Sequence, residues 1–79
     1  MPRFYFHLIN DVDVTDEEGK ELPDLEAARE YAEGNVRFTA SETLKENGVV
    51  VLSHCIKIED AEGNVLDTVY FRDVLTIKG

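Results

Sequence analysis

The sequence predicts an α+β fold in which an antiparallel sheet of about four strands, in the order β-β-α-β-β, packs on one long helix. Residues 3–9 and 50–58 both alternate apolar side chains with the period of two that is typical of strands buried on one face. Between residues 25 and 44, apolar side chains recur instead at spacings of three and four, which predicts a helix. We expect residues 1–79 to form a single small α+β domain.

The first strand is expected at residues 3–9 (RFYFHLI), which are rich in aromatic and β-branched side chains. Asn10 and Asp11 favour a turn, and Val12 and Val14 then alternate with polar neighbours, so we expect a short returning strand and a hairpin. One face of the first strand carries Phe4, Phe6 and Leu8, and the other carries Tyr5, His7 and Ile9.

The helix is expected to begin after the N-cap residue Asp24 and to extend to Glu46, a length of roughly 34 Å. Gly48 suits the left-handed position that ends many helices. Gly34 is a weak point inside the helix, because glycine costs roughly 1 kcal/mol relative to alanine there. The apolar stripe that faces the sheet consists of Leu25, Ala28, Ala32, Val36, Ala40 and Leu44.

A second, longer strand is expected over residues 49–60, with a short glycine-containing turn at 61–64 and a returning strand at 65–71. The tail from Arg72 onwards is expected to be a further strand or a short helical turn. The predicted core between sheet and helix contains Phe4, Phe6, Leu8, Leu25, Ala28, Ala32, Val36, Leu52, Ile56, Ile58 and Phe71.

Two segments share a sequence pattern: DEEGKEL at 16–22 recurs as DAEGNVL at 60–66. Aspartate at the first position of a type I turn caps the backbone with its side chain, and glycine at the fourth position can adopt positive φ. We therefore expect Asp16 with Gly19, and Asp60 with Gly63, to form two similar turns.

The acidic residues around the first turn also raise the question of a calcium site, because Asp11, Asp13, Asp16, Glu17 and Glu18 precede a glycine. An EF-hand loop needs glycine at position 6 and usually glutamate at position 12. Neither of the registers that begin at the first two aspartates meets this requirement. We favour turns over a metal site, and we expect no metal and no cofactor.

Negative charge is concentrated in one part of the chain. Residues 10–33 contain ten acidic residues against two basic ones, a net −8 of the total −9. Such a surface repels phosphate backbones, so we expect no nucleic-acid partner, whereas attraction to a basic protein is favourable. The expected partner-binding residues are Asp11, Asp13, Asp16, Glu17 and Glu18.

Cellular location is inferred from what the sequence lacks. Cys55 is the only cysteine, so no internal disulfide forms, and no apolar run reaches the roughly 18 residues that a membrane span needs. The first residues also lack the apolar stretch of a signal peptide. We expect a cytoplasmic protein that does not bind membranes.

The second face of the sheet carries apolar side chains that one helix cannot cover. We expect these residues to form a contiguous patch that is covered by a second copy of the chain, as a homodimer, or by Val74, Leu75 and Ile77 of the tail. The expected self-association residues are Tyr5, Ile9, Val51, Cys55 and Tyr70.

Catalytic chemistry is not predicted. His54 and Cys55 resemble a base and a nucleophile, but adjacent residues of a strand point to opposite faces. We therefore expect a non-catalytic protein-interaction module, not an enzyme, whose acidic face at residues 10–33 docks on a basic partner. The alternative is a small-ligand or metal-binding protein that uses His7, His54 and nearby carboxylates.

The motifs MPRFYFHL, DEEGKELPDLEAAR and LSHCIKIEDAEGNVLDTVYFRD span nearly the whole chain. In these motifs the sequence resembles a family of short acidic bacterial proteins classed as a domain of unknown function, which has no established activity, cofactor or catalytic residues to carry over to this chain. Residues 21–36 (ELPDLEAAREYAEGNV) are also similar to antitoxins of the HicB type, which implies a protein partner.

Overall fold

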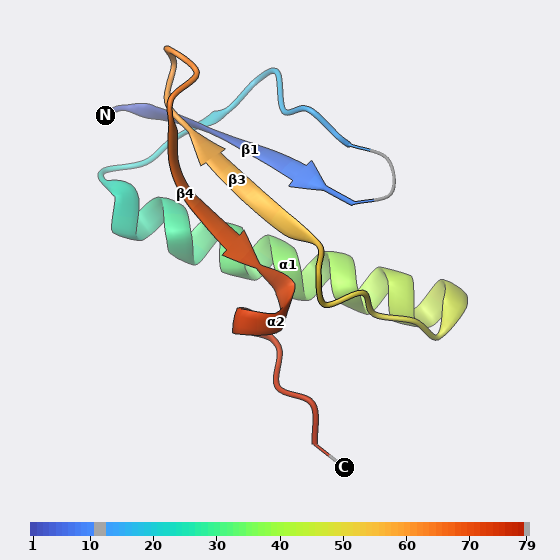
Figure 1. The fold of residues 1–79 in the computed structure, drawn as a ribbon. Helices are drawn as coiled ribbons and strands as arrows, with labels where there is room; N and C mark the ends of the chain where they lie inside the picture. The colour runs from blue at the N-terminus through green and yellow to red at the C-terminus, as the bar shows by residue number, and fades with distance from the viewer. Residues whose placement is uncertain (11–12, 79) are drawn as a thin grey trace.

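The computed structural model describes residues 1–10 and 13–78 and has the α+β architecture that the sequence predicts. All strand pairs are antiparallel, and the order across the sheet is β2-β1-β3-β4 (Figure 1). The elements are β1 (Arg3–Ile9), β2 (Lys20–Glu21), α1 (Leu25–Asn47), β3 (Cys55–Glu59), β4 (Val65–Tyr70) and α2 (Phe71–Val74).

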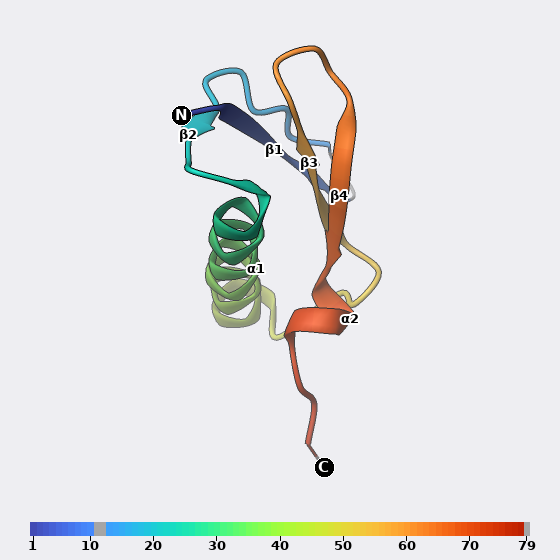
Figure 2. The same ribbon diagram turned by 90° about the vertical axis from the view of Figure 1, so that its left-hand side faces the viewer.

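One face of the sheet packs on α1, and this inner face contains the core (Figure 2). The helix contributes mainly alanines to the contact, and their small side chains allow the helix to lie close to the larger side chains of the strands. A salt bridge also connects α1 to β4, because Arg29 Nε lies 2.9 Å from Asp67 Oδ2. The buried core residues are Phe4, Phe6, Ala28, Ala32, Val36, Ala40, Ile56, Ile58, Val69 and Phe71.

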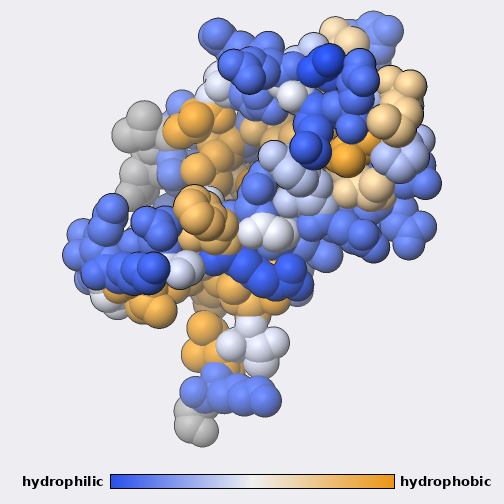
Figure 3. All heavy atoms as spheres, turned by 180° about the vertical axis from the view of Figure 1, so that it is seen from behind, coloured by the Kyte–Doolittle hydropathy of each residue, from blue (hydrophilic) through white to orange (hydrophobic). Residues whose placement is uncertain are grey.

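Both ends of α1 have the predicted caps. The Ala27 N–H donates to Asp24 Oδ1 over 2.8 Å, and Gly48 has a φ of 67° while its N–H donates to the Leu44 carbonyl over 2.8 Å. The helix runs through Gly34 without interruption. Its outward face is mainly hydrophilic, with small separate apolar groups (Figure 3).

The prediction of a strand from residue 49 was wrong, because β3 begins only at Cys55. The preceding residues form a turn in which the His54 N–H donates to the Val51 carbonyl over 3.3 Å. The main chain of this turn bonds to the first turn of α2 instead of to a strand, because the Leu52 carbonyl accepts from the Arg72 N–H over 3.2 Å. Leu52 is therefore exposed instead of buried, and among the predicted helix-stripe residues Leu25 and Leu44 are exposed as well.

The first hairpin also differs from the prediction. Val14 forms only an isolated bridge with Leu8, and the strand that returns along β1 is β2, at Lys20 and Glu21. The predicted positions Asp11 and Val12 lie outside the described residues. β2 can be only two residues long because, between its pairing with Phe4 and the bridge at Leu8, the side chain of Asp16 accepts the hydrogen bond of the Phe6 N–H at the edge of β1.

The tail adopts the helical alternative, as α2. Val74 and Leu75 pack against the core on the inner side, whereas Ile77 is 70% exposed. Residues after α2 extend away from the sheet (Figure 2). The tail therefore does not cover the outer face. Among the described residues, no helix is long and apolar enough to cross a membrane.

Candidate functional site

The turn at Asp16 is built around the carboxylate of that residue. Oδ1 accepts from the N–H groups of Glu18 and Gly19, and Oδ2 accepts from the N–H of Phe6 in β1, each over 3.1 Å. The last bond gives β1 a partner between its pairings at Phe4 and Leu8. Asp16 thus closes its own turn and completes the edge of the sheet.

The electrostatics of Asp16 follow from this geometry. Burial alone raises the pKa of the carboxyl group, but hydrogen bonds from the N–H groups of Gly19, Phe6 and Glu18, together with the nearby His7, outweigh burial and lower the pKa. Asp16 is therefore held as a carboxylate. Its hydrogen-bonding capacity serves the fold, which makes it a poor candidate for contact with a partner.

The second turn repeats the first at Asp60. Oδ1 accepts from the N–H groups of Glu62 and Asn64 over 3.0 and 2.9 Å, and the Asn64 side chain donates to Oδ2 over 3.0 Å. These bonds, led by that of the Asn64 side chain, lower the pKa of Asp60. Gly19 and Gly63 have φ angles of 70° and 85°, so the prediction of two turns with positive-φ glycines is confirmed.

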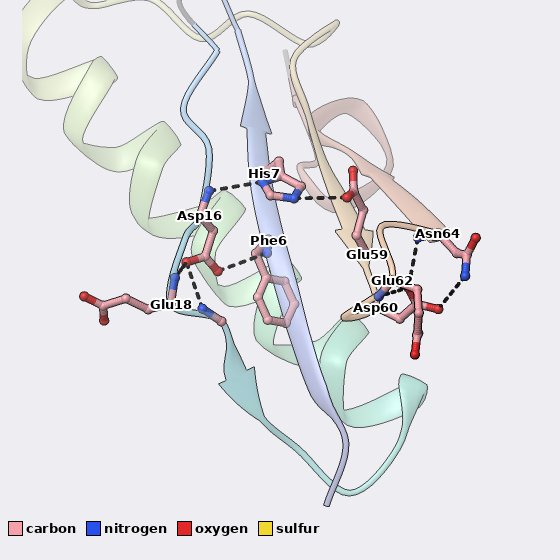
Figure 4. A network of polar contacts seen from close by, with 9 residues as sticks. Phe6, His7, Asp16, Glu18, Glu59, Asp60, Glu62 and Asn64 are labelled. Atoms are coloured by element: carbon pink, nitrogen blue, oxygen red, sulfur yellow. Dashed lines mark hydrogen bonds and ion pairs between the residues drawn. The ribbon is translucent and has the colours of Figure 1, made fainter.

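His7 connects the first turn to the sheet. Its Nδ1 accepts from the Asp16 N–H over 3.1 Å, and its Nε2 lies 3.3 Å from Glu59 Oε1 in β3 (Figure 4). The side chain of His7 is 15% exposed. Nothing in the sequence indicates this contact, because it joins a strand side chain to a loop main chain nine residues away.

The predicted partner-binding acids separate into different environments. Glu17 and Glu18 are exposed at the tip of the first turn, and Asp13 is exposed beside the bridge residue Val14. Asp16 points inward, and Asp11 lies outside the described residues.

The second turn also carries an exposed acidic residue that was not among the predicted partner-binding residues. Glu62 is exposed in the second turn. Figures 1 and 2 show both turns toward the same end of the molecule, and Figure 4 shows Glu18 and Glu62 on opposite sides of β1 and β3. The repeated DxEG pattern pointed to this acid, but the sequence did not show where the two turns lie relative to each other. We use the name acidic surface for Glu17, Glu18 and Glu62.

The predicted self-association residues do not form one contiguous patch. In the register of the sheet, Ile9, Cys55 and Tyr70 lie in one row across the outer face, and Tyr5 lies opposite Glu59 in another. A polar row of His7, Lys57 and Thr68 separates these two rows. Val51 belongs to the turn before β3 and not to the sheet.

Cys55 is already covered within the monomer. It is 6% exposed, and burial raises the pKa of its thiol, with Lys57 and Asp13 as the nearby charges. Self-association through Ile9 and Tyr70 stays a prediction.

The two histidines do not converge. His7 lies on the outer face, whereas the ring of His54 makes an edge-on contact with the core residue Phe71, at 5.8 Å between centroids. Residues 1–10 and 13–78 contain no group of three or more His, Cys, Asp or Glu side chains that could hold a metal ion, and no pocket.

Comparison with known proteins gives a family but no function. The model of a domain of unknown function, DUF6894, matches residues 3–72. The chain belongs to this family. The match includes both turns, α1 and the whole sheet, so the DUF6894 fold contains every element of the site described above. No curated protein and no solved structure matches the chain.

Proposed function

We propose that this DUF6894 protein is a non-catalytic interaction module whose acidic surface docks on a basic region of a partner protein. One observation supports the proposal: the two turns use one aspartate each for internal capping and leave Glu17, Glu18 and Glu62 exposed. The fold thereby holds both turns toward one end of the molecule (Figure 1).

The capped turns favour binding for an energetic reason. Ordering a loop at an interface costs conformational entropy, and a loop that is ordered before binding avoids much of that cost. Exposed carboxylates at one end of the molecule also speed the encounter with a cationic partner and fix its orientation. The same charges disfavour nucleic acid, whose affinity for proteins comes largely from cations.

The alternative, a small-ligand or metal-binding protein that uses His7 and His54, has less support. The two side chains lie on opposite sides of the sheet, and His54 contacts Phe71 of the core. Carboxylates near His7 are engaged in the turn and the sheet: Asp16 caps backbone N–H groups, and Glu59 contacts Nε2 of the ring.

Affinity capture from a native cell lysate, at low and high salt, tests the docking proposal. The bait proteins are the wild type and a Glu17→Gln, Glu18→Gln double variant. We expect a basic protein that the wild type retains at low salt and loses at high salt, because salt screens exposed charges. The double variant should retain less of this protein even at low salt.

A control variant separates the acidic surface from net charge. Glu46→Gln with Asp73→Asn removes the same two charges from exposed positions at the end of α1 and in α2, away from the turns (Figure 1). It should retain the partner as well as the wild type does. Equal loss of the partner from both double variants, or retention that is independent of salt, would contradict docking through the acidic surface.

A further inference from the structure

The hydrogen bonds of His7 require one form of its ring. Nδ1 accepts from the Asp16 N–H over 3.1 Å, so this nitrogen carries no proton. The proton of the neutral ring then lies on Nε2, which is 3.3 Å from Glu59 Oε1 and donates toward that carboxylate. The geometry therefore fits the neutral Nε2–H tautomer.

Protonation of His7 changes the contact with the turn but not the contact with Glu59. A proton on Nδ1 converts the acceptor into a donor, which then faces the main-chain N–H of Asp16. Two donors repel each other, so the Asp16 N–H loses its partner. The Nε2–H keeps its carboxylate partner and gains charge assistance.

The charges around His7 come from three elements. Glu59 of β3 lies at Nε2, and Lys57 of the same strand is the direct cross-strand neighbour of His7. The Asp16 carboxylate of the turn is close enough to be influenced by the ring. Within β1, Tyr5 is the titratable neighbour on the same face. Glu59 and Asp16 are the acidic groups near the ring, and Lys57 is the basic one.

We propose that His7 is a protonation-sensitive latch of the first turn: the neutral ring holds the Asp16 main chain, and the charged ring releases it. Histidine is the side chain that ordinarily changes charge between pH 5 and 8, so mild acidification operates the latch. Release loosens the backbone that carries Glu17 and Glu18. The importance of the latch for binding rests on the proposed function, but the latch itself is a property of the isolated chain.

NMR of the isolated protein, with ¹⁵N-labelled histidine, tests the latch. At pH 7.5 we expect the Nε2–H tautomer for His7. Between pH 7.5 and 5, the Asp16 amide signal should shift with the same midpoint as the His7 ring. Its protection from hydrogen exchange, corrected for intrinsic rates, should fall by about fivefold, the factor that corresponds to a hydrogen bond of about 1 kcal/mol.

The Asn64 amide and two histidine variants serve as controls for the Asp16 amide. The Asn64 N–H donates to Asp60 in the matching turn, where no histidine accepts from the main chain, so its protection should stay constant over the same range. In a His7→Gln variant, a neutral side-chain oxygen is available as an acceptor for the Asp16 N–H, and the transition of that amide should disappear. In His54→Gln it should persist.

The latch is contradicted if the His7 ring titrates while the Asp16 amide keeps its shift and its protection, or if the Asp16 transition survives in His7→Gln. Because these measurements involve no partner, they can succeed when affinity capture fails, and capture at pH 7.5 can succeed when the latch fails.

Discussion

Replacing Asp16 by alanine should destabilise the protein strongly, although the residue lies in a surface turn. The substitution removes the acceptor of three main-chain N–H groups, those of Phe6, Glu18 and Gly19. Only the Glu18 amide, whose bond is exposed, can readily turn to water, because the Gly19 bond is partly buried. The Phe6 N–H lies on the edge of β1, between the pairings to Val14 and β2, and is left partly buried without a partner.

The magnitude follows from these bonds. An unsatisfied buried donor costs about 1–3 kcal/mol, and a turn or cap hydrogen bond contributes roughly 0.5–1.5 kcal/mol. Since water replaces part of the loss at the exposed Glu18 amide, we expect the free energy of unfolding to fall by about 2–3 kcal/mol. For a domain of this size that lowers Tm by on the order of 10–20 °C.

Asp60→Ala is the matched control, because it removes the cap of the same kind of turn without an N–H of a neighbouring strand. Thermal and urea unfolding of both variants at pH 7 measure the difference. We expect Asp16→Ala to be clearly the less stable. Equal loss of stability in the two variants would refute the role of Asp16 at the edge of β1.

The effect of Asp16 should also depend on pH. Its pKa in the folded protein is below the ordinary value of 3.8, so the carboxylate contributes stability that is fully present well above pH 3.8 and is lost as pH falls through the lowered pKa. The stability difference between wild type and Asp16→Ala should therefore shrink below pH 3.8. A difference that stayed constant down to pH 2 would show that the charge of Asp16 does not matter.

Three further predictions concern glycines and self-association. Gly19→Ala should lower the free energy of unfolding more than Gly63→Ala does, because a Cβ at Gly19 lies 2.9 Å from the Phe4 carbonyl oxygen, whereas a Cβ at Gly63 meets nothing within 4 Å. Chemical unfolding measures both variants, and equal losses would contradict the steric argument. Gly34→Ala should raise the free energy of unfolding by about 0.5–1 kcal/mol, since the site is helical and open, and a loss in urea unfolding would show that glycine is required there. Light scattering at high micromolar concentration should give the mass of a dimer for the wild type and of a folded monomer for Tyr70→Glu; a monomeric wild type would refute self-association.

The sequence was sufficient for the elements whose signals are local. The alternation in β1, the cap at Asp24 and the glycine at 48 each depend on neighbours within a few residues, and the structure has all three. The two turns were predictable for the same reason. The start of β3 was not, because Leu52 continues the alternation although its main chain pairs with α2 and not with a strand.

The site was less predictable than the fold because it depends on register and on contacts between distant segments. The sequence indicated which residues share the outer face, but the pairing of β1 with β3 placed a polar row between Tyr5 and Ile9. Likewise, the acids of the first turn were visible as a group, but only the three-dimensional arrangement separates Asp16, which is bonded internally, from Glu17 and Glu18.

The most direct test of docking is the amide chemical-shift footprint of the captured basic protein on the ¹⁵N-labelled chain. The proposal predicts that the largest shifts cluster at Glu17, Glu18 and Glu62, at the tips of both turns, and that they fade as salt is raised. A footprint centred on the outward face of α1 or on the Ile9 and Tyr70 row, with the two turns unshifted, would contradict the proposal.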